Sequence, residues 1–311
     1  ISLVIDLRGN GGGLVDQAVK VAGRFLPKGT LIVSQRGRTA ADGLEWVSNS
    51  VSPETMPLVL LVDENTASAS EIVAGAFQDR DRALIVGERT FGKGLVQNVI
   101  DLPLQTGLTL TAARYYTPSG RSIQRDYSNV SRYQYFSHIT PSSDIGLPYF
   151  EAKTLTDRRV FGGDGIVPDV NSPADLMTPR QLALLDPIFA LANDLVNGRI
   201  AGFAAITRSS SLNTADASDL PIPEVPDGVI DELAQYQTAG GTAISLETIN
   251  REREFFRARL RHHIATASVG STLAKRVLNS IDPQIKAAIR AVPAAADLNR
   301  SAERAMRSVR K

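Results

Sequence analysis

The sequence predicts an α/β core followed by a mainly helical C-terminal region. Short apolar runs alternate with helix-period patterns over residues 1–125, which is typical of a largely parallel sheet with helices packed against it. Beyond Met177 the apolar spacing is helical. We therefore expect two domains, residues 1–172 and residues 173–311.

Each element of the core is predicted from its local pattern. Apolar runs bounded by turn residues indicate strands buried on both faces, whereas alternating runs indicate strands with one exposed face. The predicted strands cover residues 3–7, 31–34, 58–62, 83–86, 95–102 and 108–115, and the predicted helices residues 14–26 and 69–78. Further on, Thr178-Pro179 and Asp282-Pro283 each place a capping residue before a proline, as at the start of a helix.

Two segments interrupt these patterns. Residues 124–163 mix aromatic and polar side chains without a period, which indicates an insertion into the first domain. We favour an outer decoration over an element that shapes substrate access. Residues 208–227 are rich in Ser, Asp and Pro and predict a linker within the second domain.

The composition excludes several function classes. Hydrophobic residues make up 43% of the chain and charged residues 22%, as in a soluble globular protein, and the formal net charge of +1 gives no field that would attract nucleic acid. The absence of cysteine excludes thiol catalysis, thiolate metal sites and disulfides. No apolar stretch reaches the length of a membrane helix. The chain opens at Ile1 inside a predicted strand, so we interpret it as a processed form or a fragment of a longer protein.

A hydroxyl-rich run precedes the helix predicted over residues 69–78. Its candidate nucleophiles are Thr66, Ser68 and Ser70. The commonest role of such residues is to cap the helix that follows. The alternative is a nucleophile between a strand and a helix N-terminus, where free N–H groups and the helix dipole favour developing negative charge. Spacing alone does not choose among the three hydroxyls.

Lys93 permits three interpretations. Residues 87–93 begin like a phosphate-binding loop, but Gly94 stands where that loop requires Ser or Thr, and a strand follows where a helix is required. A second interpretation is an exposed lysine in a turn. The third is a general base, for which burial against apolar neighbours would lower the pKa of the Lys93 amine and allow it to accept the proton of a serine.

A glycine-rich loop follows the first predicted strand. Four of the five residues 9–13 are glycine, but Leu14 breaks the dinucleotide-binding fingerprint, which requires glycine at that position. Glycines in such number imply that something approaches the backbone closely. An oxyanion hole built from backbone N–H groups would use this kind of loop, and each donor typically lowers the barrier by about 2.7–4 kcal/mol.

Together these segments resemble one family, the carboxy-terminal processing peptidases, also called tail-specific proteases, which are Ser-Lys serine proteases. The resemblance covers residues 1–125 and again 165–170. Its blocks stand in the family's order: Asp6-Leu7-Arg8-Gly9-Asn10-Gly11-Gly12-Gly13, Thr66-Ala67-Ser68-Ala69-Ser70-Glu71-Ile72, Gly87-Glu88-Arg89-Thr90-Phe91-Gly92-Lys93-Gly94-Leu95-Val96-Gln97, and Tyr116-Thr117-Pro118-Ser119-Gly120-Arg121-Ser122-Ile123.

The resemblance assigns roles to single residues. It implies that Ser68 is the nucleophile, that Lys93 is its base and that Gln97 orients the lysine. It also implies that the backbone N–H groups of Gly13 and Ala69 form the oxyanion hole. No metal or other cofactor is implied.

The resemblance also implies a fold, a substrate class and a location. The fold would be a crotonase- and Clp-protease-like core of β-β-α units, with a PDZ domain upstream that is absent from this chain. The activity would be a serine endopeptidase that cleaves protein or peptide substrates near exposed C-termini, exported to the periplasm or cell envelope. Two alternatives are an inactive peptide- or ligand-binding module on the same fold and an acyl-thioester enzyme of the crotonase type that binds coenzyme A.

The end of the chain is basic. Residues 246–311 contain 14 Lys and Arg against 6 Asp and Glu. We favour a solvated helix face over docking to an acidic adaptor or an anionic membrane surface. The histidines His138, His262 and His263 lie outside the motif blocks, and the last two are expected to pack or to face solvent. The sequence leaves open whether the chain forms a homo-oligomer.

Overall fold

The computed structural model describes residues 1–126, 131, 150–200, 225, 228, 230–231 and 245–309. The chain divides into two compact units, of which the first comprises Ile1–Ala174 with Ala287–Lys311 and the second comprises Asp175–Lys286. Most of the predicted insertion and of the predicted linker lies outside the described residues. Within the described part, no helix combines the length and the apolar composition that crossing a bilayer requires.

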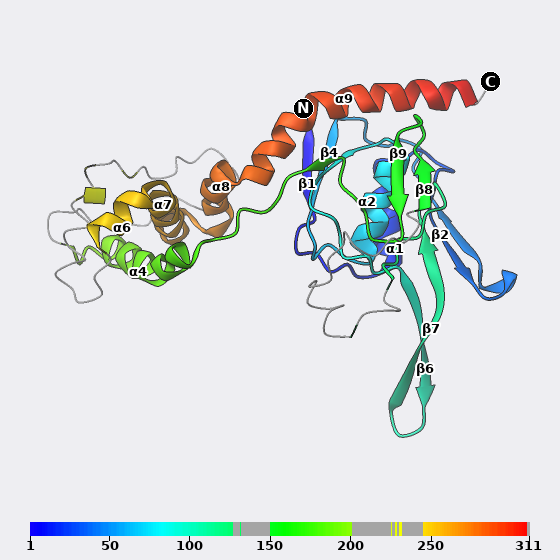
Figure 1. Ribbon diagram of the computed structural model, residues 1–311, viewed down its shortest axis with the longest axis horizontal. Coiled ribbons are helices and arrows are strands. Elements are labelled where there is room, and N and C mark those ends of the chain that lie inside the picture. Colours follow the sequence, from blue (N-terminus) through cyan, green and yellow to red (C-terminus); the bar gives the residue numbers. More distant parts are fainter. Residues whose placement is uncertain are drawn as a thin grey trace. The chain divides into compact units, whose positions relative to one another are not determined.

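A parallel four-stranded sheet lies at the centre of the first unit (Figure 1). Its strands, in spatial order, are β1 (Leu3–Asp6), β4 (Leu58–Val62), β5 (Leu84–Gly87) and β10 (Val170–Asn171). Every residue of β4 and β5 is buried, as expected for continuous apolar runs in the middle of a parallel sheet. The predicted strand over residues 58–62 therefore has the same limits in the structure.

Two helices pack beside this sheet. In α2 (Ala69–Asp79) all eleven residues are buried, and α1 (Val15–Gly23) buries the small residues Ala18 and Ala22. Ile72 and Phe77 of α2 join the strand residues of the main hydrophobic core. Because α2 starts directly after the turn that carries Ser68, its burial holds that turn against the core.

A second sheet of four strands is antiparallel. In spatial order it consists of β3 (Leu44–Val47), β2 (Leu31–Gly37), β7 (Thr106–Tyr116) and β6 (Leu95–Leu102). The expectation of a largely parallel sheet is therefore wrong for half of the strands in the two larger sheets. The short connection between β6 and β7 permits only antiparallel pairing. The β6–β7 hairpin extends well beyond the helices of this unit (Figure 1).

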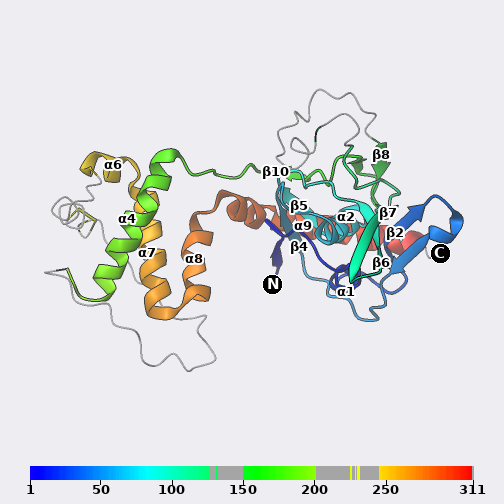
Figure 2. The same ribbon diagram turned by 90° about the horizontal axis from the view of Figure 1, so that it is seen from below.

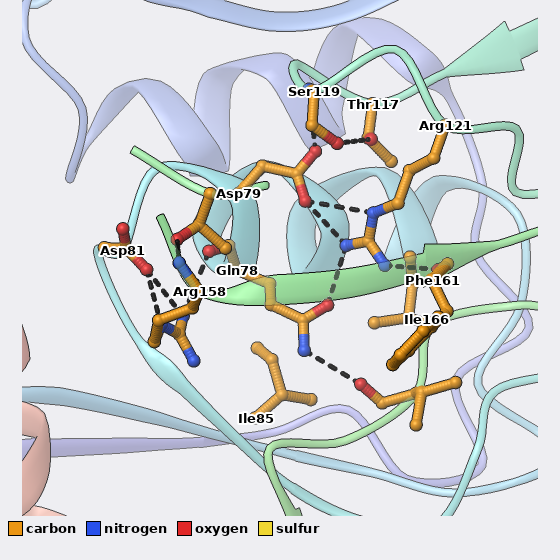
Figure 3. Close-up of polar contacts among 12 residues, drawn as sticks. Gln78, Asp79, Asp81, Ile85, Thr117, Ser119, Arg121, Arg158, Phe161 and Ile166 are labelled. Carbon is orange, nitrogen blue, oxygen red and sulfur yellow. Dashed lines mark hydrogen bonds and ion pairs between the residues drawn. The ribbon is translucent and has the colours of Figure 1, made fainter. Parts of the chain in front are cut away.

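Within the predicted insertion, the described residues include a short hairpin. It is formed by β8 (Phe150–Lys153) and β9 (Arg159–Gly162), which pair antiparallel. Together with the turn at residues 117–121, this hairpin meets the C-terminal end of α2 through buried ion pairs (Figure 3).

Arg121 is the centre of the first of these contacts. Its side chain is 1% exposed and donates from Nε and Nη2 to Asp79 Oδ1 at 3.0 and 2.7 Å. It also donates to Gln78 Oε1 and to the Phe161 carbonyl oxygen, both at 2.7 Å. Ser119 N–H donates to the other oxygen of Asp79. The Thr-Pro-Ser-Gly-Arg block thus stabilises the end of α2, where cations are favoured.

Arg158 makes the second contact. It donates to Asp81 Oδ1 and Asp169 Oδ1, both at 2.7 Å, and Asp169 Oδ2 accepts from the Ile85 N–H at the start of β5. Gln78 Nε2 donates to Asp169 Oδ1 and to the Val167 carbonyl oxygen. The segment around residues 165–170 therefore contributes ion pairs and hydrogen bonds at the end of α2 opposite Ser68.

The second unit is helical in its described residues, in agreement with the sequence. Its helices are α4 (Pro179–Val196), α6 (Leu246–Arg251), α7 (Arg253–Val269) and α8 (Ser271–Ile281). Thr178 caps α4, since its hydroxyl accepts from the Gln181 N–H, as the Thr-Pro pattern predicts. Leu184 and Ile188 of α4 pack with Phe256 and Leu260 of α7 in a separate core.

The helix α9 (Pro283–Val309) starts after Asp282, whose carboxylate accepts from the N–H groups of residues 284 and 285. Figures 1 and 2 show its continuous course. From residue 287 on it belongs to the first unit. There Asn299 Nδ2 donates to the Thr55 carbonyl oxygen at 2.9 Å, and Ala295 and Ala302 are buried.

Candidate active site

The turn between β4 and α2 separates the three candidate hydroxyls. Thr66 is fully buried, and its Oγ1 accepts from the Asp63 N–H and lies 2.9 Å from the Leu7 carbonyl oxygen. Ser70 is buried in the first turn of α2. Ser68 is half-buried. Thr66 therefore stabilises the turn, and Ser68 is the most accessible of the three.

The backbone of Ser68 is strained. Ser68 occupies the N-cap position of α2, but its φ of +57° and ψ of −118° differ from the extended conformation of an ordinary cap. Such a conformation costs about 1–3 kcal/mol in a non-glycine residue and is found most often at functional sites. A sharp turn with strain, between a strand and a helix, is also how α/β-hydrolases expose a nucleophilic serine.

The glycine-rich loop packs directly against this turn. Gly12 has φ +91°, and a Cβ atom there would lie 2.6 Å from the Ala67 carbonyl oxygen and 2.7 Å from the Ala69 nitrogen. The Gly12 N–H donates to Asn10 Oδ1, so it is already used. The N–H groups of Gly13 and Ala69, the two predicted oxyanion donors, have no acceptor among the described residues.

The loop that carries Lys93 is held by backbone hydrogen bonds on both sides. Phe91 N–H donates to the Thr66 carbonyl oxygen at 2.9 Å, and Gly94 N–H donates to Gln124 Oε1. The side chain of Arg125 lies over the Phe91 ring. Lys93 itself is exposed, so the expectation that apolar neighbours bury it is wrong for this structure.

Glu71 connects the serine turn to the lysine loop, and the sequence analysis missed its role. Its carboxylate is fully buried, and Oε2 accepts from the N–H groups of Ser68 and Lys93, both at 2.8 Å. The other oxygen accepts from Thr90 Oγ1 at 2.5 Å and Gly92 N–H at 2.7 Å. Burial raises the pKa of Glu71, and these four hydrogen bonds oppose the rise. The Ser-x-x-Glu spacing of a capping box was the signal that could have found it.

The candidate catalytic side chains are not joined to one another. Gln97 lies on β6 opposite Thr111 and is exposed. Among the described residues, no hydrogen bond links Ser68 Oγ, Lys93 Nζ and the Gln97 side chain. The structure thus brings the backbones of Ser68 and Lys93 together through Glu71, and it places Gln97 on the strand that begins two residues after the lysine.

The histidines lie elsewhere. His262 and His263 are on α7 in the second unit, where His263 stacks edge-on against Phe189 and the His262 ring nitrogen Nδ1 lies 3.1 Å from the Ala274 carbonyl oxygen. His138 lies outside the described residues. Within the ranges that the structure describes, no three His, Asp or Glu residues are grouped so that they could hold a metal ion.

Comparisons with known proteins identify similar sequences. Residues 2–130 match the model of peptidase family S41. A chloroplastic C-terminal processing peptidase of Tetradesmus obliquus is 47% identical over 123 residues, or 40% of this chain and 26% of that protein. A carboxy-terminal-processing protease of Bartonella bacilliformis is 51% identical over 122 residues, or 39% of this chain and 28% of that protein.

One solved structure is also similar to this chain. A photosystem II D1 C-terminal processing protease aligns with a TM-score of 0.40 and 34% identity, over 55% of this chain and 34% of that chain. The chain spans between a quarter and about a third of the length of these three relatives.

Proposed function

Because residues 2–130 of this chain match the model of peptidase family S41, we propose that it carries the catalytic core of a serine endopeptidase of the C-terminal processing type. The core would be of the crotonase- and Clp-protease-like kind, built from β-β-α units. Its substrates would be proteins or peptides cleaved near exposed C-termini. By the same resemblance the protein would act in the periplasm or cell envelope. The name of the Tetradesmus relative places that protein in the chloroplast.

The proposed reaction is acyl transfer to Ser68. Its Oγ attacks the carbonyl carbon of the scissile peptide bond, and the neutral amine of Lys93 accepts the hydroxyl proton. The oxyanion of the tetrahedral intermediate accepts hydrogen bonds from the Gly13 and Ala69 N–H groups. Lys93 then returns the proton to the leaving amine as the C–N bond breaks. Water hydrolyses the resulting ester, with Lys93 again acting as base.

The observation that carries this proposal is the shared carboxylate of Glu71. It brings a strained, half-buried serine at a helix N-terminus and a lysine loop to one point, although they are far apart in the sequence. The Lys93 amine, on a flexible four-carbon stem, would then approach the Ser68 hydroxyl from this shared anchor. The N–H groups of Gly13 and Ala69 have no acceptor among the described residues, so both remain available to donate to an oxyanion.

Substrate binding would complete the site. Lys93 is exposed in the free chain. A polypeptide lying over Lys93 would shield its amine from water, which favours the neutral form that a general base requires. Gln97 would then orient that amine from β6.

The test is cleavage of an unstructured protein that ends in apolar residues. We expect Ser68→Ala and Lys93→Ala each to abolish cleavage, and Lys93→Arg to do the same because a guanidinium keeps its proton. Lys20→Ala, at an exposed lysine of α1, serves as the control and should cleave normally. Near-normal cleavage by Lys93→Ala would refute the mechanism.

A second candidate function is a peptide-binding module without catalysis. The exposure of Lys93 and the absence of a hydrogen bond between Ser68 Oγ and Lys93 Nζ favour it. Under this hypothesis a labelled peptide would bind equally well to the unaltered chain and to Ser68→Ala, and mass spectrometry would detect no product with either protein.

A further inference from the structure

A pocket lies between α9 and the C-terminal end of α2, within the first unit. Its volume is about 90 Å³. Six apolar side chains contribute to its wall: Phe25, Leu26, Pro27, Pro53, Ala302 and Met306. One water molecule needs about 10–15 Å³ of such space, so the pocket has room for a group of about six non-hydrogen atoms. A mostly apolar wall with a few polar groups is typical of a small-molecule site.

The guanidinium of Arg82 is buried at this pocket. Arg82 lines the pocket and is 6% exposed. Nε donates to the Phe25 carbonyl oxygen at 3.1 Å, and Nη2 donates to the carbonyl oxygens of Glu54 and Met56, both at 2.9 Å. Nη1 is shielded from water and has no acceptor among the described residues. The hydrogen bonds of Arg82 in the described chain thus go to neutral carbonyl groups.

The charge of Arg82 has no bonded counter-ion in the described part of the chain. Moving a guanidinium out of water is costly unless an opposite charge accompanies it. The cost is visible in the pKa of Arg82, which burial lowers to about 10. The charge of Glu303 on α9 opposes that shift without forming an ion pair with Arg82. A negative group in the pocket would therefore stabilise a charge that the fold leaves uncompensated.

A second guanidinium lines the same pocket. Arg80 follows α2, and among the described residues it makes one hydrogen bond, from Nε to the Leu31 carbonyl oxygen at 3.3 Å. Burial lowers the pKa of Arg80, and the neighbouring Asp79 opposes this change. The carboxylate of Asp79 already accepts from Arg121 and from the Ser119 N–H. Arg80 is thus free to face an anion in the pocket.

Two glutamates also line the pocket and oppose an anion. Glu54 Oε1 accepts from Arg24 Nη2 at 3.0 Å, so its charge is already paired. Glu303 makes no ion pair with any described residue. With the Arg24–Glu54 pair set aside, Arg80 and Arg82 face one glutamate, which leaves one positive charge. One negative charge on a ligand would neutralise it.

We propose that this pocket binds a small aliphatic carboxylate, with its charge beside Arg80 and Arg82 and its short apolar chain against Phe25, Leu26 and Met306. The ligand would contact α9 and the body of the first unit at once, so its binding would stabilise the packing of the helix.

The pocket is separate from the candidate active site. Ser68 precedes α2 and Arg80 follows it, so the eleven residues of the helix, about 16 Å, lie between them. The inference therefore does not depend on the proposed function, and binding is measured without any cleavage assay.

The probe is sodium butyrate, whose anion has six non-hydrogen atoms. It is titrated against the full chain at constant ionic strength and followed by broadening of its NMR signals. Butyramide has the same size without the charge and should bind at least tenfold more weakly. Acetate lacks two methylene groups and should bind about tenfold more weakly. Equal affinities for butyrate and butyramide, or for butyrate and acetate, would overturn the proposal.

Two substitutions at the pocket should shift the affinity for butyrate in opposite directions. Arg80→Met removes one positive charge and one long hydrogen bond, so we expect binding about fivefold weaker. Glu303→Gln removes one negative charge at nearly the same size, so we expect binding about fivefold tighter. A purely structural role of these side chains would not reverse the sign. Weaker binding by both variants would refute the assignment.

Arg38→Met is the matched control for Arg80→Met. Arg38 is exposed and follows β2, whereas Thr30, which lines the pocket, precedes that strand. The seven residues of β2 place about 23 Å between the two positions. Arg38→Met should therefore leave the affinity for butyrate unchanged. A loss equal to that of Arg80→Met would reveal a general effect of net charge and would contradict a site at the pocket.

Thermal unfolding gives an independent measurement. A ligand that binds the folded state alone raises the temperature of unfolding. We expect saturating butyrate to raise the midpoint of the full chain by about 2–4 °C, and the same concentration of butyramide to leave it unchanged. An unchanged midpoint with butyrate would show that the folded chain does not bind it.

Discussion

The backbone N–H groups of Ser68 and Lys93 donate to the same oxygen atom, Oε2 of Glu71, at 2.8 Å each. A single buried carboxylate therefore sets the distance between the turn that carries the candidate nucleophile and the loop that carries its candidate base. Because Glu71 belongs to the first turn of α2, the rigidity of that helix is transmitted to both segments.

Glu71→Ala should destabilise the protein and abolish its proposed activity. The substitution leaves three backbone N–H groups and the Thr90 hydroxyl without their acceptor, and each unpaired buried group costs about 1–3 kcal/mol. We expect the free energy of unfolding, measured with urea, to fall by about 3 kcal/mol or more. Ser68→Ala should keep the free energy of unfolding within about 1 kcal/mol of that of the unaltered protein. Loss of activity through unfolding can therefore be told apart from loss of the nucleophile.

Glu71→Gln should change how stability depends on pH. Burial raises the pKa of Glu71 in the folded chain above its ordinary value of 4.5. The folded state then binds the proton more tightly than the unfolded state, so this group's contribution is fully present below pH 4.5 and is lost as the pH rises through the folded pKa. The stability of the unaltered protein relative to Glu71→Gln should therefore decrease from pH 4.5 upward. A constant difference across the titration would contradict the raised pKa.

Ser68→Gly and Ser68→Ala should differ in stability although both remove the hydroxyl. Glycine adopts positive φ without strain, whereas alanine keeps the strain of the native serine. We expect the glycine variant to be about 1 kcal/mol more stable than the alanine variant in thermal or urea unfolding. Equal stabilities would show that the strained backbone relaxes in the absence of the hydroxyl.

Gly12→Ala and Gly13→Ala test the contact between the glycine-rich loop and the serine turn. A Cβ at Gly12 would collide with backbone atoms of Ala67 and Ala69, while a Cβ at Gly13 meets nothing within 4 Å. We expect Gly12→Ala to cost about 1–3 kcal/mol and to lower kcat sharply by shifting the Ala69 N–H. Gly13→Ala should have the same free energy of unfolding as the unaltered protein. The reverse order of stabilities would contradict the packing.

Arg121→Met should be strongly destabilising. It leaves the buried carboxylate of Asp79 without its cation, and the loss of one partner from a buried pair typically costs about 3–5 kcal/mol. Arg159→Ala breaks the exposed pair with Glu151 and should change the urea midpoint very little. If both variants unfold at the same urea concentration, the buried network at the end of α2 does not stabilise the first unit.

The elements that the sequence predicts well are those whose pattern is complete within a few residues. The strand over residues 58–62 is an uninterrupted apolar run, and that over residues 95–102 lies between clear turns; both have the predicted limits. β3 and β10 were not predicted. β10 has only two residues, and β3 (Leu44–Val47) lacks the uninterrupted apolar run that marks the equally short β5. The predicted parallel pairing is wrong for the four strands of the second sheet, because apolar spacing does not distinguish parallel from antiparallel neighbours.

The candidate site shows the same division. Local patterns locate the glycine-rich loop, the hydroxyl run and the lysine loop, because glycines and a helix start are visible in single segments. The capping-box spacing places Glu71 beside the Ser68 N–H, but its bonds to Thr90, Gly92 and Lys93 come from a separate segment, so no local pattern contains them. The exposure of Lys93 likewise depends on tertiary packing, and the motif around it predicts nothing about its access to water.

The last helix has a consequence for how this protein is made. Residues 287–309 of α9 complete the first unit, which otherwise consists of residues 1–174. A ribosome synthesises the chain from the N-terminus. The unit that holds Ser68 and Lys93 is therefore incomplete until residues 287–309 have been made, more than a hundred residues after residue 174. A nascent chain halted after residue 174 would lack the helix against which Thr55 and Arg82 are placed. The first unit can therefore finish folding only after the segment from residue 287 onward has been synthesised.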